Sequence, residues 1–277
     1  MSDALSPALL SAARGGDRAA FDRLFGPEVP KLRGVLRRLV GHPEDVNDLA
    51  QQALLRAFEG LGAFRGDSSA GTWLCSIGTR LAIDHLRARK RWRERAQTIF
   101  AAACLDDEAL AGEVGQAMSD PAFAYDVNEH IAYCFTCVGR SLTPEAQAAL
   151  VLRDVLELSN DEAAAAIGLN RSTFRHRLAE ARQQMQQRFE GLCALVNKEG
   201  VCWQCAGLRE VTPRDRRGPA PPSELRWPRR LAIVREAALD RGRCRPMHDV
   251  FFRYTETQEQ DGRGDDAGVT DCGRPSD

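Results

Sequence analysis

Apolar residues recur at helical spacing along most of the chain, with polar residues between them. In the segment 45–61, Val46, Leu49, Ala53 and Ala57 fall on one face of a helix. The same spacing predicts further helices over residues 29–40, 72–95, 130–142, 145–154, 161–167 and 171–196. Glycine and proline separate these segments. The pattern therefore predicts an all-α protein.

Shifts in composition divide the 277 residues into segments. We expect a helical domain over 6–96, an acidic linker over 97–127, a second helical domain over 128–198, a cysteine-containing C-terminal extension over 199–260 and a disordered tail over 261–277. The linker is expected to lack tertiary contacts or to be poorly ordered. The extension is too short to fold alone, so we expect it to pack on one of the two helical domains as an attached regulator. The alternative is a partly helical, weakly docked tail.

The net charge of −1 hides a strong segregation of charge. Residues 80–95 contain seven basic and two acidic side chains, whereas residues 98–129 contain seven acidic and no basic ones. A polyanion responds to such a local basic stripe and not to the net charge, so the composition is compatible with a nucleic-acid partner.

The segment 161–196 has the pattern of a helix-turn-helix. A short Ala-rich helix is followed by a turn at Gly168, Leu169 and Asn170, and a basic helix begins at Arg171. This order favours binding of DNA in the major groove. The alternative is an ordinary helical hairpin with a solvated basic face.

Two stretches resemble one known family. The motifs EDVNDLAQQALLRAFEGLGAFRG and TWLCSIGTRLAIDHLRARKR in the first domain, and SLTPEAQAALVLRDVLELSNDEAAAAIGLNRSTFRHRLAEARQQM in the second, resemble bacterial extracytoplasmic-function (ECF) sigma factors. The resemblance implies an alternative sigma factor that binds core RNA polymerase and directs promoter recognition. An anti-sigma factor is then a candidate partner. The competing hypothesis is a helix-turn-helix regulator that binds DNA without polymerase, which would have no need of the first domain.

The resemblance also implies roles for individual residues. The residues that match polymerase-binding positions are Asp45, Asp48, Leu49, Gln51, Gln52 and Phe58. Those expected to contact promoter DNA near the −10 element are Arg80, Arg87, Arg89, Lys90, Arg91 and Arg93. Those that match positions reading the −35 element are Arg171, Ser172, Arg175, His176 and Arg177. For Leu49 and Phe58, a place in the core is the competing interpretation.

The chain has nine cysteines, and the family pattern does not require them. Cys134 and Cys137 form one C-x-x-C pair, and Cys202 and Cys205 form another. Such pairs supply thiolates to a tetrahedral ion, which makes one structural zinc ion the leading hypothesis. A redox or metal sensor at the same cysteines and merely unpaired cysteines are the alternatives. Cys193 and His130 are candidate substitute ligands.

Other functional classes have little support in the sequence. No apolar run is long enough to cross a membrane, and the N-terminal residues do not form a secretion signal, so we expect a cytoplasmic protein without a membrane partner. We find no glycine-rich phosphate loop and no nucleophile elbow. The chain is therefore not expected to be an enzyme.

Overall fold

The computed structural model describes residues 7–89, 96–202, 204–218, 225–237, 239 and 242–260. Within these ranges the protein is helical and has no β-strand, which confirms the predicted all-α class. No helix in the described part is long and apolar enough to span a membrane. The expected disordered tail lies outside the described residues.

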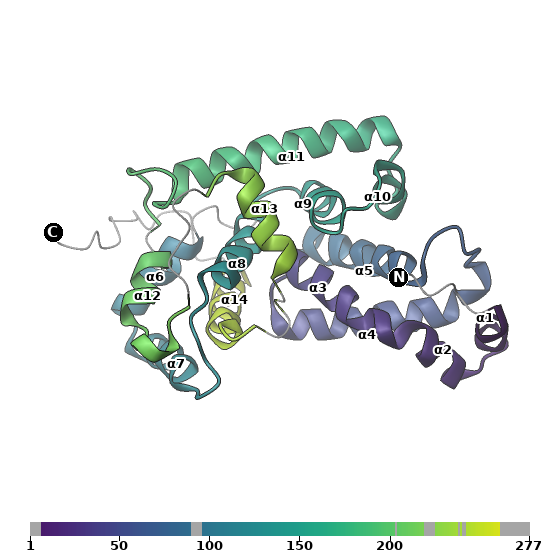
Figure 1. Ribbon diagram of the computed structural model, residues 1–277, viewed down its shortest axis with the longest axis horizontal. Helices are drawn as coiled ribbons and strands as arrows, with labels where there is room; N and C mark the ends of the chain where they lie inside the picture. The colour runs from purple at the N-terminus through teal and green to yellow at the C-terminus, as the bar shows by residue number, and fades with distance from the viewer. Residues whose placement is uncertain are drawn as a thin grey trace.

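The first domain is a bundle built on three helices. These are α3 (Val29–Leu39), α4 (Pro43–Glu59) and α5 (Ala70–Arg87), and the shorter α1 (Pro7–Arg14) and α2 (Arg18–Phe25) complete it (Figure 1). Ser69 caps α5 by accepting a hydrogen bond from the backbone of Thr72 at 3.0 Å. Gly78 lets α5 approach α3 closely, because a Cβ there would lie 2.4 Å from the side chain of Leu32.

The second domain contains α8 (Val127–Gly139), α9 (Pro144–Leu150), a π-turn at Val151–Val155, α10 (Asn160–Ala166) and α11 (Arg171–Leu192). Ser159 and Glu162 form a capping box at the start of α10, and Asn170 caps α11. Gly168 adopts a φ of 70° in the turn between these helices. The predicted helix-turn-helix is therefore present in the fold.

The prediction that the linker lacks tertiary contacts is wrong. Its residues form α6 (Ala96–Asp106) and α7 (Glu108–Ser119), and both helices pack against the C-terminal helix α14 (Arg245–Gln260). The ring of Phe100 lies 5.2 Å from that of Phe251 and 5.4 Å from that of Tyr254. The apolar side chains on which the linker packs thus lie about 150 positions later in the sequence. The composition of the linker alone does not reveal this contact.

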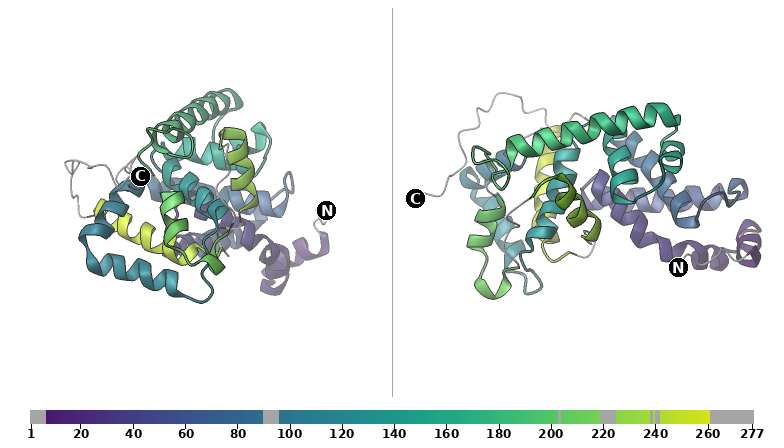
Figure 2. Two further views of the ribbon diagram at one scale, coloured as in Figure 1. Left: turned by 60° about the vertical axis from the view of Figure 1, so that its left-hand side comes forward. Right: turned by 45° about the horizontal axis from the view of Figure 1, so that its top comes forward.

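The C-terminal extension contributes α12 (Gln204–Val211), α13 (Trp227–Glu236) and α14. Helix α13 packs on α8, and α14 lies between the linker helices and the first domain, as both views of Figure 2 show. Arg38 of α3, which is 7% exposed, donates hydrogen bonds to the carbonyls of Val234 and Ala237 at 2.7 and 2.8 Å. The extension therefore contacts both helical domains. The expectation that it packs on a single domain is wrong.

The two domains also contact each other directly. Gln147 of α9 donates to the carbonyls of Arg38 and Leu39 at 2.9 and 3.1 Å, and Arg140 donates to the carbonyl of Val40 at 2.7 Å. All three carbonyls lie at the C-terminal end of α3, where a helix leaves acceptors unpaired. The structure is thus a closed form in which the domains and the extension share one core.

Candidate nucleic-acid interface and metal centre

One face of α4 is exposed and carries the candidate polymerase contacts. The side chains of Asp48, Gln51 and Gln52 are exposed, and Leu55 joins them at 55% exposure. Positions 48, 51, 52 and 55 are separated by three, four and seven residues, so they share one helical face. Sequence reasoning missed Leu55, although its spacing from Asp48 was the signal that places it there. A single exposed leucine is ordinary on a protein surface, so Leu55 adds an apolar side chain to this face but does not by itself mark an interface.

Two other candidate residues on α4 face inward. Leu49 is 4% exposed and belongs to the core. Phe58 is half-buried and packs edge-on against Phe21, with ring centroids 5.2 Å apart. Both side chains stabilise the first domain in this form, as the core interpretation expected.

Asp45 lies in a charged cluster at the start of α4. Its carboxylate is within ion-pair distance of His42, His85 and Arg89, at 3.6, 3.4 and 3.3 Å. Burial acts to raise the pKa of Asp45, but the hydrogen bond and charge of His85 and the charge of Arg89 outweigh burial and hold that pKa below its ordinary value. Asp45 is therefore ionised and engaged within the chain.

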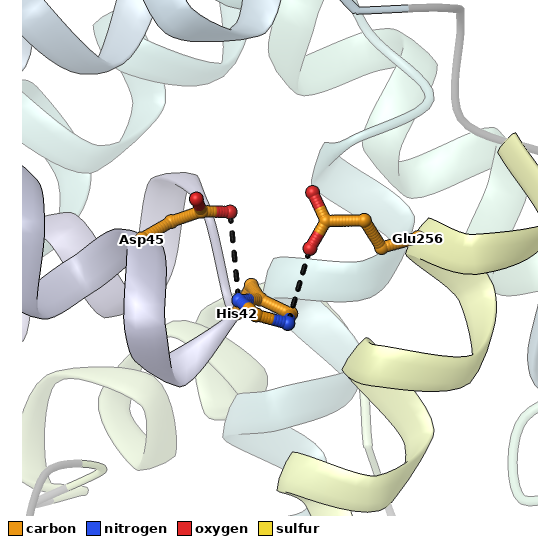
Figure 3. A group of neighbouring side chains, drawn as sticks. All are labelled: His42, Asp45 and Glu256. Carbon is orange, nitrogen blue, oxygen red and sulfur yellow. Dashed lines mark ion pairs between the residues drawn. The ribbon is translucent and has the colours of Figure 1, made fainter. Parts of the chain in front are cut away.

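Glu256 brings α14 into the same cluster. His42 lies between the two carboxylates, with Asp45 on one side and Glu256 on the other at 3.1 Å (Figure 3). Among the described residues, these three are the only group that places three ligand atoms within 4.8 Å of one another. The guanidinium of Arg89 ion-pairs with both carboxylates. The guanidinium of Arg89 supplies the positive charge that a metal ion would otherwise provide. We therefore interpret the cluster as an ionic contact between the first domain and the extension.

Two basic residues of α5, both with exposed side chains, are bonded to the second domain in the closed form. Arg80 donates to the carbonyls of Ala165 and Ala166 at 2.7 and 2.8 Å, at the C-terminal end of α10. Arg87 donates to Glu145 of α9 at 2.7 Å. Three candidate DNA contacts, Arg80, Arg87 and Arg89, are thus bound to the second domain or to the extension. Lys90, Arg91 and Arg93 lie outside the described residues.

The start of α11 presents a basic, exposed surface. Ser172, Arg175 and His176 are exposed there. Arg171 ion-pairs with Asp161 at 3.3 Å, and Arg177 is 3.7 Å from Glu145. The first turns of this helix remain open to solvent, as a recognition helix requires.

Six cysteines line a cavity of about 450 Å³ at the other end of α11, among them Cys134, Cys193, Cys202 and Cys205. Burial raises the pKa of the Cys205 thiol, and the nearby Cys134, Cys193 and Cys202 thiols raise it further. Cys137 lines the same cavity and is 2% exposed in the main core. None of the eight cysteines that the structure describes is in a disulfide. The fold thus brings all four candidate metal ligands to one cavity, together with the candidate substitute Cys193.

Sequence profiles of two known regions match the chain in order. The profile for Sigma-70 region 2 matches residues 24–92, and the profile for Sigma-70 region 4 matches residues 135–185. The first match contains α4 and α5, and the second contains the helix-turn-helix. The residues after 185, which include Cys193, Cys202, Cys205, α13 and α14, lie outside both profiles.

Individual relatives agree with the profiles. The chain is similar to the RNA polymerase sigma-H factor of Pseudomonas aeruginosa, with 31% identity over 187 residues that cover 66% of this chain and 93% of the relative. It is 29% identical to the ECF RNA polymerase sigma-E factor of Escherichia coli over 184 residues, 66% of this chain and 94% of the relative. The solved complex of CnrH with the cytosolic domain of CnrY is 22% identical, covers 68% of this chain and 98% of CnrH, and has a TM-score of 0.44.

Proposed function

The chain belongs to the ECF family of RNA polymerase sigma factors, and from this premise we propose which of its surfaces act and how the closed form controls them. It is an alternative sigma factor that binds core RNA polymerase and directs promoter recognition and transcription initiation. The match of the first domain to region 2 removes support from a regulator that acts without polymerase.

We assign polymerase binding to the exposed face of α4. Asp48, Gln51 and Gln52 provide polar contacts around the apolar side chain of Leu55. A central apolar contact surrounded by polar groups is the usual anatomy of a protein interface. Asp45 joins this surface when the contact of its cluster with Glu256 is broken.

Promoter recognition is divided between α11 and α5. Ser172, Arg175 and His176 are exposed in this form and are the contacts with the −35 element. Arg80, Arg87 and Arg89, together with Lys90, Arg91 and Arg93, hold DNA phosphates near the −10 element. Arginine suits both tasks, because its guanidinium pairs with guanine edges and with phosphate.

The observation that carries the regulatory proposal is that Arg80, Arg87 and Arg89 are bonded within the closed form. Promoter DNA competes for the same guanidinium groups, so the domains and α14 separate before these residues bind DNA. The C-terminal extension is thus a built-in inhibitor. An anti-sigma factor is a further candidate partner. We assign the protein to the cytoplasm, where polymerase and promoters are found, with no catalytic activity of its own.

Run-off transcription tests the assignment. The full chain is combined with core polymerase on a template selected from a random promoter library. Specific transcripts that require both proteins support the sigma function. Transcripts absent with core both from the full chain and from the Gly41→Ala variant described below, or DNA binding of equal specificity without core, would refute the function.

Gly41→Ala tests the inhibitory role separately. Gly41 has a φ of 83°, and a Cβ there would lie 2.3 Å from the ring of Phe252 on α14. The substitution therefore blocks docking of α14 and should raise transcription above that of the wild type. Gly16→Ala is the matched control, because Gly16 has a φ of 92° and nothing within 4 Å of an added Cβ. Equal transcription by the two variants would refute inhibition and leave the sigma function intact.

A further inference from the structure

The loop after α11 brings Cys193 and Cys202 side by side. Helix α11 ends at Leu192, and the chain folds back so that Cys202 donates to the carbonyl of Leu192 at 2.8 Å and Ala194 donates to that of Cys202 at 3.2 Å. Gly200 makes the turn possible, since a Cβ there would lie 2.6 Å from the carbonyl carbon of Cys193. Cys205 follows in the first turn of α12. Three thiols of one short loop therefore line the same cavity.

A fourth thiol faces this loop from α8. The side chain of Gln97 donates to the sulfur of Cys134 at 3.8 Å, and Gln204 donates to the carbonyl of Gln97 at 2.6 Å. Gln97 thus ties Cys134 to the start of α12. Burial raises the pKa of the Cys134 thiol, the nearby Cys202 and Cys193 thiols raise it further, and the charge of Arg230 opposes this.

Arg230 of α13 is a buried cation at the same place. It is 1% exposed, its guanidinium stacks on Phe189 at 3.8 Å, and it donates to the sulfur of Cys193 at 3.7 Å. In the described part of the chain, no carboxylate lies within ion-pair distance of it. A buried charge is costly unless an opposite charge compensates it. The Cys193 thiol, which can carry a negative charge, is in contact with this guanidinium.

We infer that Cys134, Cys193, Cys202 and Cys205 bind one zinc ion and that Arg230 stabilises this centre through the Cys193 sulfur. Four thiolates around Zn²⁺ carry a net charge of −2, which gives the buried guanidinium its counter-charge. A donor to a ligand sulfur is a usual outer partner of a metal site. No three of these described sulfurs lie within 4.8 Å of one another. Coordination at about 2.3 Å per sulfur therefore pulls the 193–205 loop toward α8.

This ligand set differs from the two C-x-x-C pairs that spacing alone suggests. Cys137 also lines the cavity, and we assign the fourth ligand position to Cys193 because it lies beside Cys202 and accepts the hydrogen bond of the buried Arg230. The zinc then joins the end of the second domain to α13, through Arg230. The inference does not depend on sigma activity, since its test reads the metal itself.

The experiment measures zinc in the full chain, purified from cells grown with added zinc and washed free of loosely bound metal. The wild type should hold about one zinc ion per chain. Cys193→Ser should lose most of it, whereas Cys137→Ser should retain it. Cys104→Ser is a further control, because Cys104 lines the cavity but is not one of the proposed ligands. Wild-type protein without zinc, or zinc lost from Cys137→Ser and kept by Cys193→Ser, would overturn the proposal.

Thiol alkylation of the wild type gives a second reading that requires no variant to fold. Mass spectrometry should find that a chelator increases labelling of Cys134, Cys193, Cys202 and Cys205 and leaves Cys137 unchanged. If the chelator increased labelling of Cys137 and left Cys193 unchanged, the proposed set of ligands would be overturned.

Arg230→Met, compared with Arg229→Met at an exposed position of the same helix, tests the outer partner. Zinc affinity should fall about 10- to 100-fold in the first variant only. Equal affinity in the two variants would remove Arg230 from the site.

Discussion

Arg37 of α3 and Asp249 of α14 form an ion pair of 2.9 Å, with side chains that are 2% and 12% exposed. The pair joins the first domain to the C-terminal extension across 212 positions of sequence. Burial raises the pKa of Asp249, and the charge of Arg37 opposes that rise. The contact is therefore a buried lock between the polymerase-binding domain and the extension.

Asp249→Asn should open this lock. Removing one partner of a buried ion pair typically costs about 3–5 kcal/mol, because the other charge stays desolvated. Release of α14 exposes Arg37 to water and removes this cost. We therefore expect a lower melting temperature, together with tighter binding to core polymerase because the first domain is no longer covered by α14. Thermal unfolding and a polymerase titration measure the two effects.

Asp22→Asn is the control for the lock, because Asp22 pairs with Arg18 at 63% and 70% exposure. It should change stability by less than about 1 kcal/mol and leave polymerase affinity unchanged. Unaltered polymerase binding by Asp249→Asn would show that the lock does not restrain the first domain.

Charge reversal on the α4 face should weaken polymerase binding. Asp48→Lys combined with Gln52→Lys alters two exposed side chains and leaves the core intact, so the melting temperature should stay within a few degrees. Leu55→Ala should weaken the same complex by removing its apolar centre. A titration with core polymerase checks both variants. Asp106→Lys at an exposed position of α6 is the control, and affinity equal to that control would exclude this face.

Arg175→Ala should weaken promoter binding at the −35 element. If Arg175 pairs with a guanine, the loss should be about 1–3 kcal/mol on the preferred sequence and smaller on others. A phosphate contact would instead give a uniform loss on all sequences. Binding of the holoenzyme to a panel of −35 variants distinguishes the two. Lys198→Ala, exposed beyond the end of α11, is the control, and a loss no larger than the control's would mean that Arg175 does not face DNA.

The pair His130 and His248 should make stability depend on pH. Burial lowers the pKa of His130 to about 4 and that of His248 well below its ordinary value of 6.5. Between about pH 4 and pH 6.5, these two histidines bind protons in the unfolded chain but not in the folded chain. Stability is therefore complete above about pH 6.5 and decreases as the pH falls toward 4.

His248→Phe isolates this effect, since a phenyl ring can keep the 3.9 Å stacking on Tyr133. The slope of unfolding free energy against pH should be up to about 1.4 kcal/mol per pH unit shallower than in the wild type. Comparing the two proteins cancels the opposite contribution of Glu129, whose pKa burial raises to about 6. His176→Phe, at an exposed position, should keep the wild-type slope. An identical slope in His248→Phe would show that the pair does not control stability.

Local features of the fold were predictable from the sequence, and long-range ones were not. The stripe containing Val46 and Ala53 predicted α4 because helical periodicity depends only on neighbouring residues. Arg37 and Arg38 are buried, and local sequence does not reveal this because the extension that contacts them is distant along the chain. The spacing of cysteines favours Cys137, whereas the proposal for Cys193 rests on its contact with Arg230, which lies 37 positions later in the sequence.

The two roles of Arg89 have a consequence for genetics. Arg89 ion-pairs with Glu256 in the closed form, and it is also a candidate contact for promoter DNA. Loss of the arginine therefore removes inhibition and activity together, whereas loss of Glu256 removes inhibition alone. A selection for constitutive transcription should recover substitutions at the acidic partners, Glu256 and Glu145, and not at Arg89 or Arg87. In each ion pair, the recovered alleles would thus change the acidic residue and leave the arginine unchanged.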